Sequence, residues 1–580
     1  MILQQGRALS SKETESIDKD ASAVTVTGTL SPSSLESSEP DSLFLHSWRL
    51  AAVIGSLFLG IFLLALDMNI IAVAIPRITS DFHALDDVAW YGSAYLLTVT
   101  AFQPSFGNLY KYFDPKIVYM GSIALFELGS ILCAAAPSSS VLIGGRSVLG
   151  FGAAGIYQGS LAIVNFVVEL EKRPMYQGIV ISSFAISVCI GPILGGVFTD
   201  KANWRWCFWI NVPMGAVVLV FIMVFFRIRG TQNSNRSLSL STKLRRMDVF
   251  GVLLFLGAIY CLLLALQWGG QTMPWRSSKV IGLFVGFGLL IMSFAVLQWK
   301  RGGHATIPLQ ILRQRSIFMG SIFLMLFGMM SFVYAYYLPI YFQSIQGITA
   351  IQSGTRFIAI VLPQIIGLSL TGAVVTKWGY YVPYMILGTM IAMVGAGLLT
   401  TIDTNTSTVR WAAYMVTNGW GTGMAQQLPY TALQIVLSEE DAPTGNAIAV
   451  FMYQIGSSVS VSIAQSLFLS RLQTSVPAHT TAVSAEAVIK VGATGLLDLA
   501  GGSSILLAAL REAYTIAIRD AMYYALAAAS LSLPFACGMQ WFNLKKVAEK
   551  RRKGKEDRKY NNQLGSSAMI ISGPEKVEVV

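Results

Sequence analysis

Long apolar runs recur along almost the whole of this 580-residue chain, and they limit its fold more than any other feature. A helix needs about 20 consecutive apolar residues to cross the hydrocarbon core of a bilayer. Runs of this order follow one another here with short gaps of Gly, Pro and Asn between them. The chain is therefore expected to be an all-α membrane protein. Hydropathy predicts fourteen transmembrane helices, near residues 50–74, 89–109, 117–136, 141–166, 176–199, 208–226, 248–267, 279–298, 317–341, 357–376, 382–402, 411–431, 445–469 and 521–543.

The composition agrees with a chain that is solvated by lipid. Hydrophobic residues make up 54% of it and charged residues 12%, whereas a soluble domain carries about 25% charged residues. The net charge of +11 does not indicate nucleic-acid binding, because the basic residues stand at the ends of apolar runs. The five cysteines and four histidines lack metal-ligand spacing, so no metal or other cofactor is expected. No nucleotide-binding or metalloprotease motif occurs, and the sequence predicts no enzyme.

The basic residues also predict the topology. Lys and Arg are enriched in one set of alternate loops and in the C-terminal tail, and the positive-inside rule then places both termini in the cytoplasm. An even number of spans, such as fourteen, satisfies this arrangement. The loop at 470–520 and the sequon at Asn405 then lie outside, which makes Asn405 a candidate N-glycosylation site.

A weak internal repeat divides the chain into two halves. The loop from Gly107 to Lys116, after the second span, is similar to the loop from Gly372 to Lys377, after the tenth. Spans one to six and nine to fourteen then form two six-helix bundles, with two helices inserted between them. The expected segments are a disordered cytoplasmic tail (1–48), an N-terminal bundle (49–227), a cytoplasmic loop (228–247), two inserted helices (248–298), a C-terminal bundle (299–544) and a basic cytoplasmic tail (545–580).

Few charged residues interrupt the spans, and each of them is informative. Asp67 lies deep in the first span, where a charge costs about 2.5–3.5 kcal/mol on insertion scales. Protonation removes that cost, so Asp67 is a candidate for proton coupling, with a hydrogen-bonded structural role as the alternative. Arg146 in the fourth span cannot deprotonate and must pair or face water, unless its side chain extends to the interface. Glu127 in the third span belongs to no motif, and a hydrogen-bonded or outward-tilted carboxyl is expected.

A stripe of small residues marks the fifth span. Ser187, Gly191 and Gly195 recur every four residues, so a helix presents them on one face that another helix can approach closely. Pro192 removes one backbone donor and is expected to bend the helix beside this stripe. Gly178 lies off the register and is expected to tolerate a side chain better.

The stripe and the segment Trp204–Gly215 together resemble the antiporter motif of the major facilitator superfamily, in its fourteen-span drug:proton antiporter branch. On this resemblance, Gly191, Pro192, Gly195 and Gly196 form that motif.

Further motifs support the same resemblance. The surroundings of Asp67 resemble the first-span motif of the branch. Arg146 is spaced from the glycines that follow it as in a span-four motif associated with proton transfer. The loop after the second span resembles the cytoplasmic gating loop only at Gly107, Leu109 and Lys116. Lys111 and Asp114 depart from its pattern, which puts the usual charge relay of that loop in doubt.

Polar and aromatic residues in otherwise apolar spans are candidates for a substrate cavity. Such groups could line a site for a bulky, weakly polar ligand. Interfacial anchoring and interhelical hydrogen bonding are the alternatives for each residue taken singly. The candidates are Tyr337, Gln343, Trp420, Gln426 and Gln427.

The resemblance covers about residues 49–470 and implies a proton-coupled efflux transporter of the fungal type. Its substrate would be a small amphipathic compound such as a secondary metabolite, mycotoxin or drug, exported by alternating access. The expected partners are that substrate, protons and membrane lipids, for a monomer in the plasma membrane. A proton-coupled importer, or a vacuolar or vesicle carrier of a ferric siderophore or basic amino acid, would use the same fold. A non-transporting membrane sensor is a third interpretation.

Overall fold

The structure is a computed structural model, and it describes residues 48–83, 87–226, 239, 241–243, 248–270, 273–302, 305, 307–492 and 495–554. The regular structure of the described residues is helical, apart from two isolated β-bridges, and every described helix belongs to one compact unit, Leu43–Val580. The expected N-terminal tail, most of the loop at 228–247 and most of the C-terminal tail lie outside the described residues, so those three predictions stay predictions.

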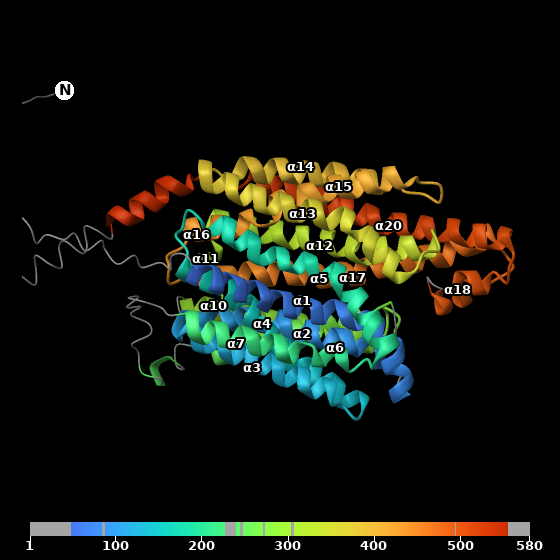
Figure 1. The fold of residues 1–580 in the computed structure, drawn as a ribbon, viewed down its shortest axis with the longest axis horizontal. Helices are drawn as coiled ribbons and strands as arrows, with labels where there is room; N and C mark the ends of the chain where they lie inside the picture. Colours follow the sequence, from blue (N-terminus) through green and yellow to red (C-terminus); the bar gives the residue numbers. More distant parts are fainter. Residues whose placement is uncertain are drawn as a thin grey trace, which may run out of the picture. The chain divides into compact units, whose positions relative to one another are not determined.

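The first group of helices contains the candidate proton-coupling residues (Figure 1, blue to green). Within this group α1 packs along α5 and α7, and α4 packs along α2 and α3. Asp114 begins α3 by accepting a hydrogen bond from the Lys116 backbone, with Pro115 in the first turn. The group comprises α1 (Trp48–Phe82), α2 (Val88–Tyr112), α3 (Pro115–Ala134), α4 (Ser139–Val167), α5 (Arg173–Lys201), α6 (Trp206–Trp209) and α7 (Asn211–Phe225).

Two helices follow, α9 (Val249–Trp268) and α10 (Ser278–Arg301), and they pack on each other. Asp248 caps α9, accepts a hydrogen bond from Gln298 at 2.6 Å and pairs with Arg301 at 3.1 Å. This buried carboxylate therefore ties the start of α9 to the end of α10. The apolar face of α9 packs against α2 and α17.

The second group of helices packs mainly through α12 against α17 and α20, and through α15 against α13 and α14. Gly379 ends α13 in the left-handed conformation at φ 83°, which glycine adopts without steric cost. The group comprises α11 (Leu309–Leu312), α12 (Arg315–Ser344), α13 (Ala350–Trp378), α14 (Val382–Leu399), α15 (Thr408–Gln426), α16 (Leu428–Val436), α17 (Ala442–His479), α18 (Ala485–Val491), α19 (Leu496–Leu499) and α20 (Ser504–Cys537).

The number of spans is only partly supported. Fourteen described helices have at least 15 residues, namely α1 to α5, α7, α9, α10, α12 to α15, α17 and α20. Ten are long and apolar enough to cross a membrane, with α6 and α7 taken together, or eleven if the bent α5 counts as one span. The remaining three, α2, α15 and α20, carry more polar or charged residues.

The predicted boundaries need correction near the end of the chain. The sequence predicts a loop over 470–520, but α17 continues to His479 and α20 begins at Ser504. Arg471 and Asp520 pair at 3.2 Å between these two helices. Hydropathy stops at such charges, whereas the helices continue past them because the charges pair or face outward. The connection is therefore 480–503, and it contains α18 and α19.

Two predicted spans are broken. The span predicted at 411–431 consists of α15 and α16, which are separated at Gln427, with Pro429 in the first turn of α16. The span predicted at 208–226 likewise consists of α6 and α7. The predicted last span ends early, at Cys537, and residues 544–554 form a separate helix. Arg551 fixes this helix to α16 through hydrogen bonds to the backbone oxygens of Gln434, Ile435 and Leu437.

Candidate functional site

Asp67 and Arg146 form an ion pair inside the first group of helices. Asp67 is wholly buried in α1, and Arg146 in α4 is 1% exposed. A guanidinium and a carboxylate this far from solvent would each be costly alone, and pairing offsets part of the cost. The two charges that the sequence singles out separately are therefore one unit.

Neutral groups complete the shell around this pair. Asn211, the first residue of α7, donates to Asp67 at 3.3 Å and to the Ser130 hydroxyl of α3 at 2.9 Å. Arg146 donates from Nε to the Tyr91 backbone oxygen at 2.7 Å and lies 4.6 Å from the centre of the Tyr95 ring. The sequence analysis includes Asn211 in the segment Trp204–Gly215 but assigns no role to these residues, because neutral polar groups carry no strong pattern.

The small-residue stripe of α5 packs on the helix that carries Asp67. The Ser187 hydroxyl lies 3.1 Å from the Phe62 backbone oxygen. A Cβ atom at Gly191 would lie 2.7 Å from that of Asn69, and one at Gly195 would lie 2.5 Å from the Ile70 oxygen. The close approach that the stripe predicts is thus made with α1, and it leaves no room for a side chain at either glycine.

Other predictions for α5 have mixed outcomes. An added Cβ atom at Gly196 would have no atom within 4 Å, so the contact with α1 does not require a glycine at this position. The expectation that Gly178 tolerates a side chain better stays a prediction: its Cβ atom would lie 2.9 Å from the end of the Leu368 side chain of α13, which can move, whereas at Gly195 it would meet backbone. The helix bends by 44° between Arg173–Val188 and Ile193–Thr199, which brackets Pro192. The side chain of Pro192 lies outside the described ones.

Hydrogen bonds and one ion pair join the two groups of helices at the ends predicted to be cytoplasmic. We call these three the inter-group contacts. Lys111 of α2 pairs with Asp441, just before α17, at 2.6 Å. Gln158 of α4 donates to the Pro443 backbone oxygen at 2.7 Å, and Gln427 donates to Gln177 of α5 at 2.7 Å.

The predicted gating loop adjoins these contacts. A Cβ atom at Gly107 would lie 2.5 Å from that of Ala447 in α17, so the glycine permits the close approach of α2 to α17. Lys116 instead donates to the Met223 backbone oxygen at 2.6 Å, within the first group. Leu109 is partly buried and packs on the core. Lys111, at the position that departs from the family pattern, is the loop residue that makes the charged contact.

The five candidates for the substrate cavity do not form one cluster. Gln426 bonds with Gln364 of α13 at 2.9 Å and with the Tyr453 hydroxyl of α17 at 3.3 Å. Tyr337 donates to Gln465 at 3.1 Å, and Gln427 belongs to the inter-group contacts. Gln343 and Trp420 are partly exposed, and among the described residues no hydrogen bond joins them to Gln426.

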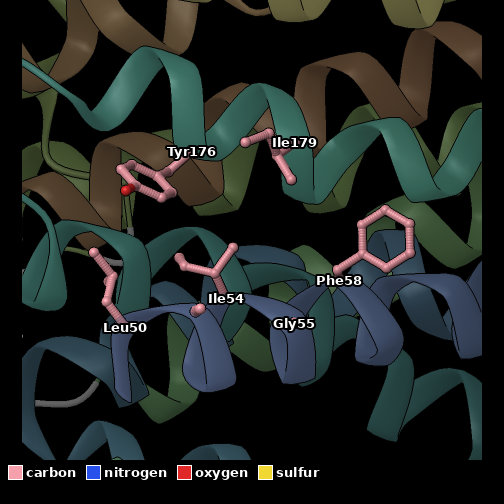
Figure 2. Close-up of a pocket in the computed structure, with 7 residues that line it drawn as sticks. Leu50, Ile54, Gly55, Phe58, Tyr176 and Ile179 are labelled. Atoms are coloured by element: carbon pink, nitrogen blue, oxygen red, sulfur yellow. The ribbon is translucent and has the colours of Figure 1, made fainter. Parts of the chain in front are cut away.

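An apolar cavity of about 430 Å³ lies between α1 and α5 (Figure 2). Leu50, Ile54 and Phe58 line it from one side, and Tyr176 and Ile179 line it from the other. None of the five predicted cavity residues lines it, and it begins at the N-terminal ends of both helices. It is therefore separate from the candidate substrate residues.

The remaining candidates are peripheral. Asn405 is exposed in the connection between α14 and α15, and its modification stays a prediction. The described residues contain no group of three or more His, Cys, Asp or Glu side chains that could hold a metal ion.

Comparison with known proteins defines the class of this chain. The Major Facilitator Superfamily model matches residues 57–461, so the chain belongs to this family of membrane transporters, which is not a family of enzymes. Solved structures agree at the level of the fold. The human organic anion transporter MFSD10 (TETRAN) matches with a TM-score of 0.55 and 13% identity, covering 85% of this chain and 100% of that one. A double Trp mutant of XylE matches with a TM-score of 0.53 and 14% identity, covering 86% and 98%.

Closer relatives are fungal. The chain is 42% identical over 510 residues to the MFS-type transporter astH of Aspergillus oryzae, covering 88% of this chain and 90% of the relative. It is 41% identical to the MFS-type efflux pump MFS1 of Trichophyton rubrum, covering 86% and 92%. It is 37% identical to the efflux pump aflT of Aspergillus parasiticus, covering 87% and 98%. The predicted family is confirmed.

Proposed function

We propose that this chain is a proton-coupled efflux transporter that exports small amphipathic compounds, such as fungal secondary metabolites, by alternating access. The observation that carries the proposal is the near-full-length similarity to several proteins named as efflux pumps. The buried ion pair of Asp67 with Arg146 supports proton coupling, because a carboxyl group is the natural proton carrier there.

In the proposed cycle, Asp67 exchanges a proton while Arg146 supplies the compensating charge. Protonation neutralises Asp67 and weakens its attraction to Arg146, so the arrangement of α1 relative to α4 becomes sensitive to proton binding. The inter-group contacts open when the cytoplasmic side opens. Gln426, with Gln364 and Tyr453, offers hydrogen bonds to the substrate, and Tyr337, Gln343 and Trp420 would contact it at separate points.

The proposed architecture has fourteen spans, with α6 and α7 forming one span and α15 and α16 another. The two six-helix bundles extend over 49–227 and 299–544, and the inserted helices over 248–298. We place both termini in the cytoplasm and the transporter, as a monomer, in the plasma membrane.

The test is transport of the cationic dye rhodamine 6G in yeast cells that lack their own efflux pumps. We expect cells with the chain to accumulate less dye, and the difference to disappear when a protonophore collapses the proton gradient. Dye accumulation above the control would instead support an importer. Equal accumulation in both strains for rhodamine 6G and a panel of fungal metabolites, at normal surface abundance, would contradict the proposal and favour a sensor. A fluorescent tag locates the protein.

A further inference from the structure

Glu127 of α3 is a buried acid that the proposed cycle does not use. Its side chain points into the contact between α3 and α7, and the residue is 8% exposed. Both carboxyl oxygens are buried, and neither has a hydrogen-bond partner among the described residues. The sequence leaves open a hydrogen-bonded or outward-tilted carboxyl, and the structure supports neither.

Gly215 of α7 makes the room for this carboxyl group. A Cβ atom at position 215 would overlap Oε1 of Glu127. Any other residue type at 215 would therefore displace the acid. The pairing of a glycine with a carboxyl is a specific fit between the two helices.

Glu127 and the hydrogen bonds of Asp67 belong to the same contact between α3 and α7, one turn apart. Ser130 follows Glu127 by three residues on α3, and Gly215 follows Asn211 by four residues on α7. Residues at these spacings share a helix face. Ser130 contacts Asn211, which reaches Asp67, and one turn away Glu127 contacts Gly215. The Glu127 carboxyl thus lies about one turn, or 5 Å, from the group that binds Asp67.

Glu127 is offset from the Asp67 site along the helices, toward the end predicted to be cytoplasmic. On α3, Glu127 lies nearer than Ser130 to Pro115, at the end of the helix predicted to be cytoplasmic. On α7, Gly215 lies nearer than Asn211 to the end predicted to be cytoplasmic, because the two helices are expected to run in opposite directions. Glu127 therefore occupies the cytoplasmic side of the Asp67 site.

The groups around Glu127 offer it no opposite charge, and burial without a partner is costly for a carboxylate. Arg146 of α4 is already paired with Asp67, α7 has no titratable side chain, and Cys207 is the titratable residue of α6. Lys111, at the end of α2, pairs with Asp441. No cation among the described residues pairs with Glu127, which suits a group that holds and releases a proton.

We infer that Glu127 is a second proton-carrying residue, which takes up the proton that leaves Asp67 and releases it toward the cytoplasm. The inference rests on the proton coupling proposed above. One proton leaves an oxygen of Asp67, which again pairs with Arg146 as a carboxylate. One proton is gained by an oxygen of Glu127, so the net charge of the site is unchanged. Release of that proton to water completes the step.

The first measurement needs no substrate. Infrared difference spectra of the purified full-length protein are recorded between low and high pH. We expect a protonated-carboxyl band that is absent in Glu127→Gln, and whose titration shifts in Asp67→Asn because the neighbouring charge is gone. Equal band intensity in the wild-type protein and in Glu127→Gln would overturn the inference.

The second measurement separates a proton-carrying role from a structural one, in vesicles with rhodamine 6G. Glu127→Gln should slow transport driven by a pH gradient about tenfold or more, while dye exchange without a gradient stays within about twofold. Glu127→Asp, which keeps a carboxyl, should restore part of the driven transport. Glu169→Gln is the matched control, because it removes a surface carboxylate that pairs with Lys172 at 2.9 Å.

The outcomes distinguish the two proposals. Equal loss of driven transport and exchange in Glu127→Gln would indicate a structural role and overturn the inference. Normal gradient-driven transport in Glu127→Gln, together with loss of that transport in Asp67→Asn, would also overturn the inference. The proposal that Asp67 couples transport to protons would then stand. If transport by the wild-type protein does not depend on the pH gradient, the proposed proton coupling is wrong, and the inference about Glu127 is wrong as well.

Discussion

At the scale of single residues, the site shows how one buried charge determines its neighbours. Arg146 cannot lose its proton, so the carboxylate of Asp67 compensates it in the protein interior. Asn211 then donates a hydrogen bond to Asp67, and the Tyr91 backbone oxygen accepts one from Arg146. Charge at Asp67 is thus tied to the contacts of four helices, α1, α2, α4 and α7.

Asp67→Asn should separate stability from transport. The amide keeps the size of the side chain but leaves Arg146 buried without a counter-charge, which typically costs 3–5 kcal/mol. We expect a lower unfolding temperature of the purified protein and loss of proton-driven efflux at matched surface abundance. The double variant Asp67→Asn with Arg146→Gln should recover stability and remain inactive. Wild-type efflux by Asp67→Asn would remove Asp67 from the coupling mechanism.

At the scale of helices, α5 and α1 depend on each other through the stripe. Gly191 and Gly195 bring the backbones together, and Gly196, one position along, faces open space. Gly195 and Gly196 are adjacent in the chain but have different surroundings, which the sequence motif alone does not distinguish.

Gly195→Leu and Gly191→Leu should therefore impair transport. Overpacking of this kind typically costs 1–3 kcal/mol, which a large helical bundle survives while the contact with α1 is lost. We expect both variants to reach the membrane with slowed or uncoupled efflux, and Gly196→Ala to have a smaller effect than Gly195→Ala. Gly178 serves less well than Gly196 as a control, because an added Cβ atom there would lie 2.9 Å from the end of the Leu368 side chain. Equal efflux by Gly195→Ala and Gly196→Ala would show that the contact is unimportant.

At the scale of the whole molecule, the inter-group contacts join segments far apart in sequence. Lys111 and Asp441 are separated by 330 positions, and each lies at a helix end. Partial exposure of both side chains, at 12% and 37%, limits the strength of this ion pair. Its contribution is therefore a bias between conformations of the transporter.

Charge reversal at this pair should shift that bias. An exposed ion pair contributes about 0.2–1 kcal/mol, so Lys111→Glu should increase the population open to the predicted cytoplasmic side a few-fold at most. Asp441→Lys should act similarly, and the double variant should restore the wild-type population. Labelling of a single cysteine introduced beside Gln158, from the cytoplasmic side, measures this population. Additive effects in the double variant would show that the two residues do not interact.

Topology can be tested with protease-sensitive tags. Tags at the N-terminus and after Val580 should be protected in intact cells, because both ends are predicted to be cytoplasmic. A tag in the 484–492 region, which contains α18, should be cleaved from outside. A C-terminal tag that external protease removes would require an odd number of spans and contradict the two-bundle architecture.

The sequence predicts the helical class, the family and the close-packed stripe, because hydropathy and small-residue spacing are local signals. Asp67 and Arg146 are identified for the same reason, since charges are rare in apolar runs. Their pairing, and the partnership of Lys111 with Asp441, depend on tertiary packing that local patterns do not encode. The ends of α17 and α20 were missed because hydropathy marks the membrane and helices continue beyond it.

The position of the stripe has a thermodynamic consequence for Asp67. On one face, α1 is packed without spare room against Ser187, Gly191 and Gly195 of α5, while Asp67 on another face holds Arg146. If proton binding weakens the pairing of Asp67 with Arg146, the free energy of packing between α1 and α5 changes as well, since α1 takes part in both contacts. Linkage is reciprocal, so whatever tilts α5 must alter the proton affinity of Asp67 by the same free energy. A bulkier residue at position 191 or 195 would thus change the proton affinity of Asp67 in every state of the protein.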